Sequence, residues 1–164
     1  MQLIYRALTR LSAPGIRLYL RHRVKRGKEH KKRLAERFGH PAHERPDGSL
    51  IWIHGASVGE SLSAIPLIKK IKAKHPDITI LLTSGTVTSA ELIQKRLGDE
   101  IIHQFIPVDI PAAVNRFLNH WSPDMVLWLE SELWPNILQG IKKRDIPAYL
   151  LNARMSETSF KKWS

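Results

Sequence analysis

The sequence predicts an α/β fold in which helices cover both faces of a Rossmann-like parallel sheet. Over residues 50–151, short apolar runs alternate with stretches of helical pattern. Strands that are buried on both faces have such runs, and helices are the usual crossovers between parallel strands. Polar or glycine-containing loops follow the runs, at the edge where open α/β sheets bind ligands. A basic amphipathic helical segment precedes this pattern.

The charge of the chain is concentrated in its first quarter. The formal net charge is +11, and residues 1–40, with twelve Lys and Arg against two acidic residues, carry +10 of it. Residues 41–49 contain two prolines and a glycine, which are typical of a linker. We therefore expect a membrane-associating segment over residues 1–40, a linker over residues 41–49 and a Rossmann-like domain over residues 50–164. The chain has no cysteine, which excludes disulfides and thiolate metal sites.

The first twenty residues have the pattern of a helix that lies on a membrane surface. At about 100° per residue, four arginines share one side of such a helix. The apolar side chains lie on the other side, a pattern typical of interfacial helices: Ile4, Tyr5, Leu8, Leu11, Ile16, Leu18 and Tyr19. No apolar run approaches the ~20 residues that span a bilayer. Pro14 and Gly15 predict a kink or a restart of the helix.

A basic cluster follows, with eight Lys and Arg within residues 21–33. Near an anionic membrane, each such residue contributes about 1 kcal/mol of attraction. The predicted membrane-binding cations are Arg6, Arg10, Arg17, Arg21, Arg23, Lys25 and Arg26. A solvated basic helix that packs on the protein is the alternative. Nucleic-acid binding is disfavoured because no aromatic residue lies within residues 21–37 to stack on bases.

Nine elements are expected after the linker. Five apolar runs predict strands, in chain order over residues 50–53, 78–82, 101–105, 125–129 and 148–151. Four stretches of helical pattern lie between them and predict crossover helices over residues 60–74, 88–97, 111–120 and 136–143. The carboxyl ends of the five strands lie at one edge of the sheet, so the loops that follow them are the places to look for chemistry.

The loop after the first strand contains two candidate residues, His54 and Glu60. Its glycines let a backbone approach a ligand, and the N-terminus of the following helix offers N–H groups to anions. The loop is not GxGxxG, so the dinucleotide fingerprint is absent. Ser57 and Glu60 have the spacing of a capping box, and a carboxylate at the end of a strand can also act as a general base. The same spacing at Thr88 and Glu91 predicts a structural cap only, and a lone histidine such as His54 is more often a scaffold residue than a catalyst.

The second loop, residues 83–88, contains Ser84, Gly85 and Thr86. Hydroxyls and backbone N–H groups of this kind hold a phosphate or the hydroxyls of a sugar, or they cap a helix. The spacing alone favours neither interpretation over the other.

Two further loops contain charged or amide side chains. Glu130 and Glu132 follow a buried strand, where charges are costly unless they are paired or used. Asn152 and Arg154 follow the fifth strand and are either a helix cap with a surface arginine or a contact for an anion or a sugar. The histidines and aspartates of the chain lack metal-ligand spacing, so no metal site is predicted.

Several of these segments together resemble one enzyme family, the bacterial transferases of 3-deoxy-D-manno-octulosonic acid (Kdo) in lipopolysaccharide synthesis. The similar segments are residues 36–39, 52–60, 83–90, 103–105, 130–135 and 152–154. The resemblance implies the N-terminal half of a GT-B glycosyltransferase, which has two Rossmann-like domains and a cleft between them. It also implies CMP-Kdo as donor, a lipid A precursor as acceptor, inversion of the anomeric centre, and no metal or cofactor. Attachment to anionic lipid at the cytoplasmic face of the cell inner membrane, peripheral or by the N-terminus, is implied as well.

The resemblance assigns roles to individual residues. Glu60 matches the proposed catalytic base in the family's Ser-x-Gly-Glu motif, and either Glu130 or Glu132 matches a functional glutamate of the Glu-x-Glu-Leu-Trp motif. The residues expected to bind or support substrate are His54, Ser57, Gly59, Ser84, Gly85, Thr86, Glu130, Glu132, Asn152 and Arg154. The family's CMP-binding domain has no counterpart within the 164 residues, so we expect the chain alone to bind acceptor and membrane without turnover. A non-catalytic membrane-surface module from a truncated gene is the alternative.

Overall fold

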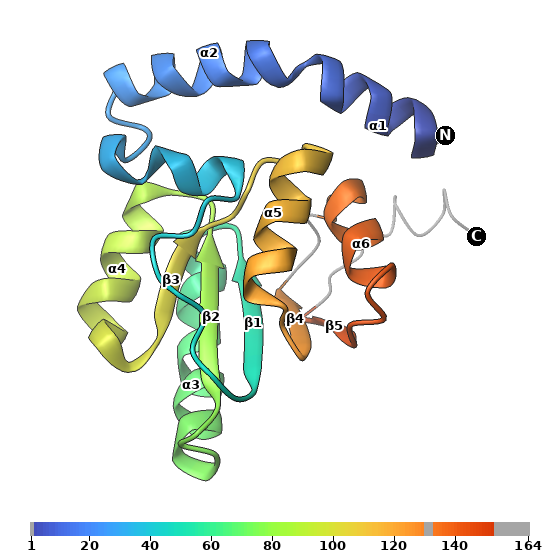
Figure 1. Ribbon diagram of the computed structural model, residues 1–164. Helices are drawn as coiled ribbons and strands as arrows, with labels where there is room; N and C mark the ends of the chain where they lie inside the picture. Colours follow the sequence, from blue (N-terminus) through green and yellow to red (C-terminus); the bar gives the residue numbers. More distant parts are fainter. Residues whose placement is uncertain (1, 130–132, 153–164) are drawn as a thin grey trace, which may run out of the picture.

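The computed structural model describes residues 2–129 and 133–152 of the protein. Five parallel strands form one sheet in the order β3-β2-β1-β4-β5 (Figure 1). The strands are β1 (Leu50–Gly55), β2 (Thr79–Ser84), β3 (Ile102–Phe105), β4 (Met125–Leu129) and β5 (Ala148–Leu151). The central position of β1 places the loop that follows it in the middle of the carboxyl edge.

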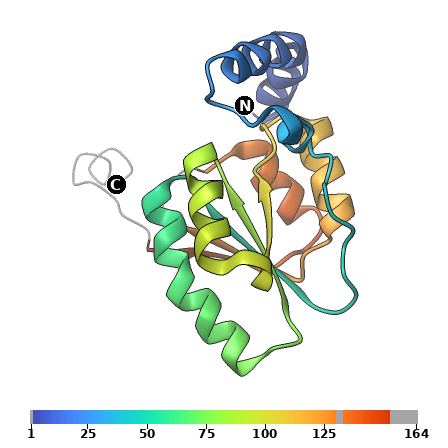
Figure 2. The same ribbon diagram turned by 90° about the vertical axis from the view of Figure 1, so that its left-hand side faces the viewer.

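Helices cover both faces of the sheet, as Figure 2 shows. One face carries α3 (Val58–Lys74) and α4 (Val87–Leu97), followed by the short η2 (Gly98–Glu100), and the other carries α5 (Pro111–Trp121) and α6 (Pro135–Lys142). The predicted fold class is confirmed, and each predicted strand and helix after the linker lies within two residues of its expected bounds.

Alternating side chains of β1 fill two separate cores. Ile53 packs with the residues of α3 and α4, whereas Trp52 packs with those of α5 and α6. The ring of Trp52 lies 4.8 Å from that of Phe117 and 5.8 Å from that of Trp128, between centroids. Such buried aromatic pairs add to the free energy of area burial, so they fix the distance between the sheet and α5.

The start of α4 differs from the prediction. Thr86, with extended backbone angles (φ −131°, ψ 153°), is the N-cap, and its hydroxyl accepts the N–H of Ser89 at 3.1 Å. The cap predicted at Thr88 and Glu91 is wrong, because Thr88 already lies inside the helix. Only an extended residue directly before a helix directs its side chain at the free N–H groups of the first turn.

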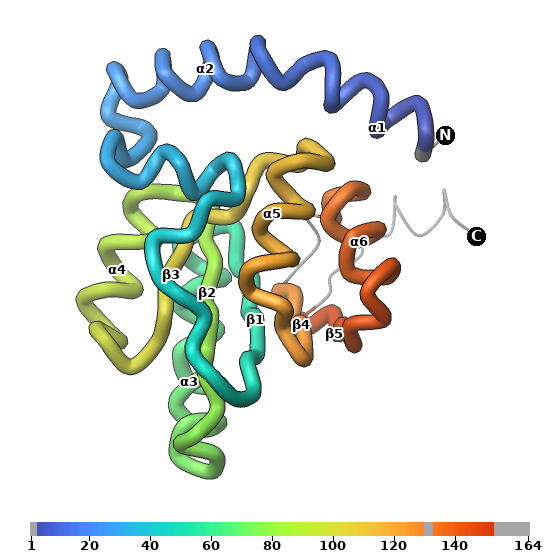
Figure 3. The backbone as a smooth tube through the Cα atoms, viewed as in Figure 1, coloured from blue at the N-terminus to red at the C-terminus, as the bar shows by residue number. Residues whose placement is uncertain are grey.

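The N-terminal segment forms an arc across the carboxyl edge of the sheet (Figures 1 and 3). It consists of α1 (Gln2–Leu11), α2 (Ala13–Lys25) and the 3₁₀ helix η1 (Lys31–Phe38). The expected restart is confirmed: the helix breaks at Ser12, and Pro14 lies in the first turn of α2, where its missing N–H costs nothing.

One side of α1 is attached to α5 and α6. Tyr5 donates its hydroxyl to Asp109 at 2.9 Å, Arg6 donates to Gln139 at 2.9 Å, and the amide of Asn136 donates to the hydroxyl of Thr9 at 3.1 Å. Burial raises the pKa of Tyr5 to about 12, helped by the hydrogen bond to Asp109, so the phenol stays a donor.

The predicted division of α1 and α2 into two sides holds for most positions and is wrong for Tyr5. The apolar side chains at positions 3, 4, 8, 11 and 18 are exposed, with Leu3 at 82% and Leu11 at 79%, whereas Tyr19, although exposed, lies toward the loops of the domain. Tyr5 lies with Arg6 on the side that contacts the domain. The reason is that a half-buried phenol needs a hydrogen-bond partner, and the Asp109 carboxylate supplies one.

Gly39 ends η1 and gives a test of how the N-terminal segment is seated. It has φ +77°, and a Cβ at this position would overlap the carbonyl oxygen of Ala113. We expect Gly39→Ala to lower the free energy of unfolding well beyond the ~1–2 kcal/mol that a left-handed conformation costs an alanine. Urea denaturation of the purified chain measures this loss.

Gly48→Ala is the matched control, because Gly48 has φ +85° and open space around its Cα. At this position we expect to lose only the ~1–2 kcal/mol that a left-handed backbone conformation costs an alanine. Equal losses in the two variants would show that η1 can move away from α5 without penalty, contrary to the close contact described above.

Candidate active site

The loop between β1 and α3 holds the carboxylate of Glu60 at the centre of the carboxyl edge. Ser57 caps α3, and its hydroxyl accepts the N–H of Glu60 at 3.3 Å. The Glu60 carboxylate in turn accepts the Ser57 hydroxyl at 2.8 Å and the N–H of Ala56 at 2.6 Å. The predicted capping box is thus confirmed, with the returning bond made to Ala56 in place of the Ser57 N–H. Glu60 is 8% exposed.

The loop after β2 lies directly against this one. The N–H of Gly85 donates to the carbonyl of Ala56 at 3.1 Å. A Cβ at Gly85 would lie 2.7 Å from the same oxygen, so a side chain here would force the two loops apart. The N-termini of α3 and α4 therefore begin side by side, and their two capping hydroxyls belong to neighbouring loops.

A buried arginine ties the N-terminal segment to these loops. Arg37 is 6% exposed and donates to both carboxylate oxygens of Glu29, at 3.0 and 3.2 Å. It also donates to the carbonyls of Ile106, at 3.2 Å, and Gly85. Sequence reasoning missed this residue, although residues 36–39 were among the segments that carried the family resemblance.

A second ion pair, in which only the carboxylate is buried, fixes the end of β3. The carboxylate of Glu36 accepts two hydrogen bonds from Arg33, at 2.7 and 2.9 Å, and one from the N–H of Phe105 at 2.7 Å. Arg33 also donates to the carbonyl and to Nδ1 of His103, at 2.8 and 2.9 Å. Since a guanidinium only donates, the proton of the neutral imidazole is on Nε2, which donates to the Ser84 hydroxyl at 2.9 Å. Ser84, a predicted site residue, is thus buried and supports β3.

His54 is a buried scaffold residue in this structure. Its Nδ1 lies 2.9 Å from the hydroxyl of Thr83, which also accepts the indole N–H of Trp52 at 2.8 Å. The imidazole lies against the ring of Trp128, 4.3 Å between centroids. Its Nε2 is buried and has no hydrogen-bond partner within the described part of the chain.

The two buried histidines are held neutral. Burial lowers the pKa of His54 to about 3, with a smaller contribution in the same direction from the positive charge of Arg37. Burial also lowers the pKa of His103 to about 3, with contributions from the charges of Arg33 and Arg37. Neither imidazole is therefore charged near neutral pH.

A groove of about 400 Å³ lies between α2 and the two loops. Ser57, Gly85 and Thr86 form one wall, and Tyr19, Leu20 and Arg23 form the wall opposite, with Trp134 also on the surface. Hydroxyls and backbone groups thus face a wall of aromatic, aliphatic and arginine side chains, and the ion pair of Arg37 with Glu29 also lines the groove. Such a groove suits a polar ligand that also has apolar parts.

The structure separates the predicted site residues into groups. It brings together Ser57, Glu60, Gly85 and Thr86, and it buries His54 and Ser84 beneath them. Gly59 is exposed beside Ser57.

The remaining predicted site residues lie apart from this group. Asn152 is exposed after β5, two strands from β1 and thus roughly 10 Å away across the sheet. Glu130, Glu132 and Arg154 lie outside the described residues. Within residues 2–129 and 133–152, no three His, Asp or Glu side chains are placed to share a metal ion.

Comparison with known proteins identifies the family. The family described as 3-deoxy-D-manno-octulosonic-acid transferase (Kdo transferase) matches residues 32–164, in its N-terminal glycosyltransferase domain. The chain belongs to the Kdo transferase family. The match includes η1 with Glu36 and Arg37, and every loop described above.

Relatives along nearly the whole chain are Kdo transferases too. The chain is 49% identical over 161 residues to a probable mitochondrial 3-deoxy-D-manno-octulosonic acid transferase of Arabidopsis thaliana, covering 98% of the chain and 36% of the relative. It is 38% identical to the 3-deoxy-D-manno-octulosonic acid transferase of Rickettsia bellii, over 99% of the chain and 39% of the relative. It is 33% identical to the 3-deoxy-D-manno-octulosonic acid transferase of Haemophilus influenzae, over 94% of the chain and 36% of the relative. The chain thus spans a little over a third of the length of these relatives.

The buried histidines predict how stability depends on pH. The unfolded chain binds protons at His54 and His103 below about pH 6.5, whereas the folded chain does not until about pH 3. Stability contributed by each histidine is therefore complete above pH 6.5 and falls by about 1.4 kcal/mol per pH unit below it. We expect a combined loss of roughly 3 kcal/mol between pH 7.5 and pH 5.5, measured by urea denaturation.

His54→Gln is expected to flatten this pH dependence by about half, whatever it does to stability at pH 7.5. His75→Gln is the control, because His75 is exposed at the end of α3, and should leave the slope unchanged. A slope that stays the same in His54→Gln would contradict a buried neutral imidazole at this position.

Proposed function

We propose that the chain is the acceptor-binding half of a GT-B glycosyltransferase that transfers Kdo from CMP-Kdo to a lipid A precursor. The observation that carries this proposal is the placement of the Glu60 carboxylate beside the groove between α2 and the loops after β1 and β2. Membership of the Kdo transferase family supports the choice of sugar. In a full-length transferase, a second Rossmann-like domain binds the CMP part of the donor in this proposal.

Glu60 is the general base in this proposal. Its carboxylate takes the proton of an acceptor hydroxyl while that oxygen forms a bond to the anomeric carbon of Kdo. The bond from that carbon to the phosphate oxygen of CMP breaks on the opposite side, and CMP leaves with the electron pair. Attack from the side opposite to the leaving group inverts the anomeric centre, and no metal ion takes part.

In this proposal, the two walls of the groove bind different parts of the acceptor. The hydroxyls of Ser57 and Thr86 and the backbone at Gly85 face the polar part, whereas Tyr19 and Leu20 offer apolar surface to the lipid part. Arg23 is held beside this wall by Glu29 at 3.0 Å. The role of Glu130 or Glu132 as a functional glutamate and the role of Arg154 in substrate binding stay predictions.

The N-terminal arc attaches the protein to the cytoplasmic face of the inner membrane in this proposal. Its apolar side chains at positions 3, 4, 8, 11 and 18 are exposed on the side away from the domain. The cations Arg10, Arg21, Lys25 and Arg26 on or next to the same helices are also exposed and favour anionic lipid. No helix in the described ranges has the length and apolar character to cross a bilayer. The exposed apolar side of α1 and α2 is the pattern of helices that lie along a membrane surface.

Replacement of Glu60 tests the catalytic role. In a full-length protein that carries this chain, we expect Glu60→Gln to slow Kdo transfer from CMP-Kdo to a tetraacylated lipid A precursor by ~10²–10⁴-fold, because the base is lost. Glutamine keeps most of the cap, so the melting temperature should change little. Glu91→Gln on α4, which replaces an exposed glutamate, is the control and should transfer at the wild-type rate.

The possible results separate the alternatives. If Glu60→Gln transfers Kdo at the wild-type rate, Glu60 is only a helix cap and another residue must be the general base. Absence of transfer by the wild type, with vesicle binding intact, would overturn the enzyme proposal and favour a non-catalytic membrane-surface module.

The membrane proposal has its own test in the exposed leucines. Insertion of a leucine into the bilayer contributes about 1.5–3 kcal/mol. We therefore expect Leu8→Gln and Leu11→Gln each to weaken binding to vesicles with anionic lipid by about tenfold or more, measured by co-sedimentation. Leu62→Gln, at a leucine that is 41% exposed on α3, is the control. Losses of equal size in all three variants would argue against an insertion surface on α1.

A further inference from the structure

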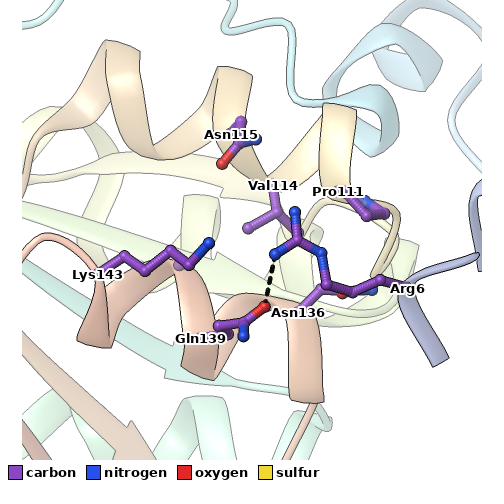
Figure 4. A pocket seen from close by; sticks show the side chains of 8 residues that line it. Arg6, Pro111, Val114, Asn115, Asn136, Gln139 and Lys143 are labelled. Atoms are coloured by element: carbon purple, nitrogen blue, oxygen red, sulfur yellow. Dashed lines mark hydrogen bonds between the residues drawn. The ribbon is translucent and has the colours of Figure 1, made fainter. Parts of the chain in front are cut away.

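A small polar cavity lies beneath α1, between α5 and α6. Its volume is about 60 Å³, well below the ~300–1,000 Å³ of pockets that enclose drug-sized ligands. Arg6 enters it from α1, Asn115 lines it from α5, and Gln139 of α6 and Lys143 directly after α6 complete the lining (Figure 4). The cavity is separate from the groove beside Ser57, with which it shares no residue. It has room for one small charged group and not for a sugar.

The charges around this cavity are unbalanced. The guanidinium of Arg6 and the ammonium of Lys143 point toward the same space, as Figure 4 shows. None of the eight lining residues is acidic. Arg6 donates to the neutral amide of Gln139, and the Lys143 ammonium has no hydrogen-bond or ion-pair partner within the described part of the chain.

The carboxylate of Asp109, which lies just before α5, does not neutralise the pair. Asp109 accepts from the Tyr5 hydroxyl and from the N–H groups of Asn136 and Ile137, and it does not line the cavity. Two cations that converge, with the amide of Asn115 beside them, are a favourable arrangement for a phosphate group.

An apolar groove continues from the cavity. It has a volume of about 660 Å³ and shares Gln139 and Lys143 with the cavity. Leu133, Pro135 and Leu138 form its apolar surface, and Lys142 lies at its margin. A free phosphate ion gains nothing by contact with such an apolar surface, whereas the glycerol and acyl part of a lipid packs favourably on it.

The position of α1 brings this site to the depth of lipid headgroups. Leu3 and Ile4 are 82% and 65% exposed on the outer side of the helix, and Arg6 lies on the inner side. An interfacial helix buries its apolar side about 5–10 Å into the boundary between headgroups and acyl chains. The opposite side of a helix about 10 Å across then lies level with the phosphates.

We propose that this cavity binds the phosphate of an anionic membrane phospholipid, between Arg6 and Lys143, with the glycerol and acyl part along Leu133 and Leu138. The site rests on the proposed attachment of α1 to a membrane. It gives Arg6 a role that differs from that of the exposed cations of the arc. They attract any anionic surface, whereas Arg6 and Lys143 hold one lipid molecule.

Binding of a monomeric lipid tests the site apart from the general attraction of a charged surface. Dihexanoyl phosphatidylglycerol, below its micelle concentration, is titrated into the 164-residue chain by calorimetry. We expect saturable binding that Arg6→Gln and Lys143→Gln each weaken by about tenfold, the loss of one charge-assisted contact. Lys70→Gln, which removes the same charge from α3, should bind within twofold of the wild type. Lys143 is exposed, so its replacement does not threaten folding.

Inorganic phosphate and vesicles provide the remaining comparisons. Binding of inorganic phosphate as tight as that of the lipid would overturn the lipid as ligand, and absence of lipid binding would overturn the site. In either case, continued binding of the wild type to phosphatidylglycerol vesicles would leave the membrane proposal standing. Failure of the wild type to bind those vesicles would overturn both proposals.

Discussion

The geometry of the candidate site depends on the buried guanidinium of Arg37. Four hydrogen bonds of this group reach Glu29, Gly85 and Ile106, so one side chain joins the N-terminal segment to the ends of two strands. Gly85 in turn donates its N–H to Ala56, whose own N–H donates to the Glu60 carboxylate. Loss of one partner of a buried ion pair costs about 3–5 kcal/mol, since the remaining charge is left without compensation. The position of the proposed base therefore follows from a residue 23 positions before it in the chain.

The same ion pair determines which side of the N-terminal arc faces outward. Glu29 accepts from both Arg37 and Arg23, and Arg23 belongs to α2. With α2 held in this way and α1 held by the bond from Tyr5 to Asp109, the apolar side of the arc is left away from the domain. The inner side of α2 is at the same time a wall of the groove beside Ser57. In the proposed function, one segment thus serves membrane attachment with one side and acceptor binding with the other, as expected if the acceptor is a lipid.

The sequence predicted the sheet and its helices because their periodicity is a local property. Each strand is a short apolar run and each helix a separate stretch, so no knowledge of distant residues was needed. Periodicity also predicted which residues of α1 share a side, but the position of Tyr5 depends on Asp109, which is 104 residues away in sequence. The same limit applies to Arg37, whose carbonyl partners at residues 85 and 106 lie on other elements. In the site, the capping spacing at Ser57 and Glu60 was visible in the sequence, whereas the contact of Gly85 with Ala56 depends on the pairing of two strands.

The capping box and the proposed base are compatible, because a carboxylate has more acceptor capacity than the cap uses. Each oxygen of Glu60 accepts one hydrogen bond from the loop, and each has a second lone pair. The bond from the Ala56 N–H is fixed by the backbone, so Oε2 keeps the side chain in place. The bond from the Ser57 hydroxyl is adjustable, because the hydroxyl rotates while its oxygen still accepts the N–H of Glu60. An acceptor hydroxyl that replaces the Ser57 hydroxyl at Oε1 therefore meets a base that is already oriented, and the helix keeps its cap while the proton is transferred.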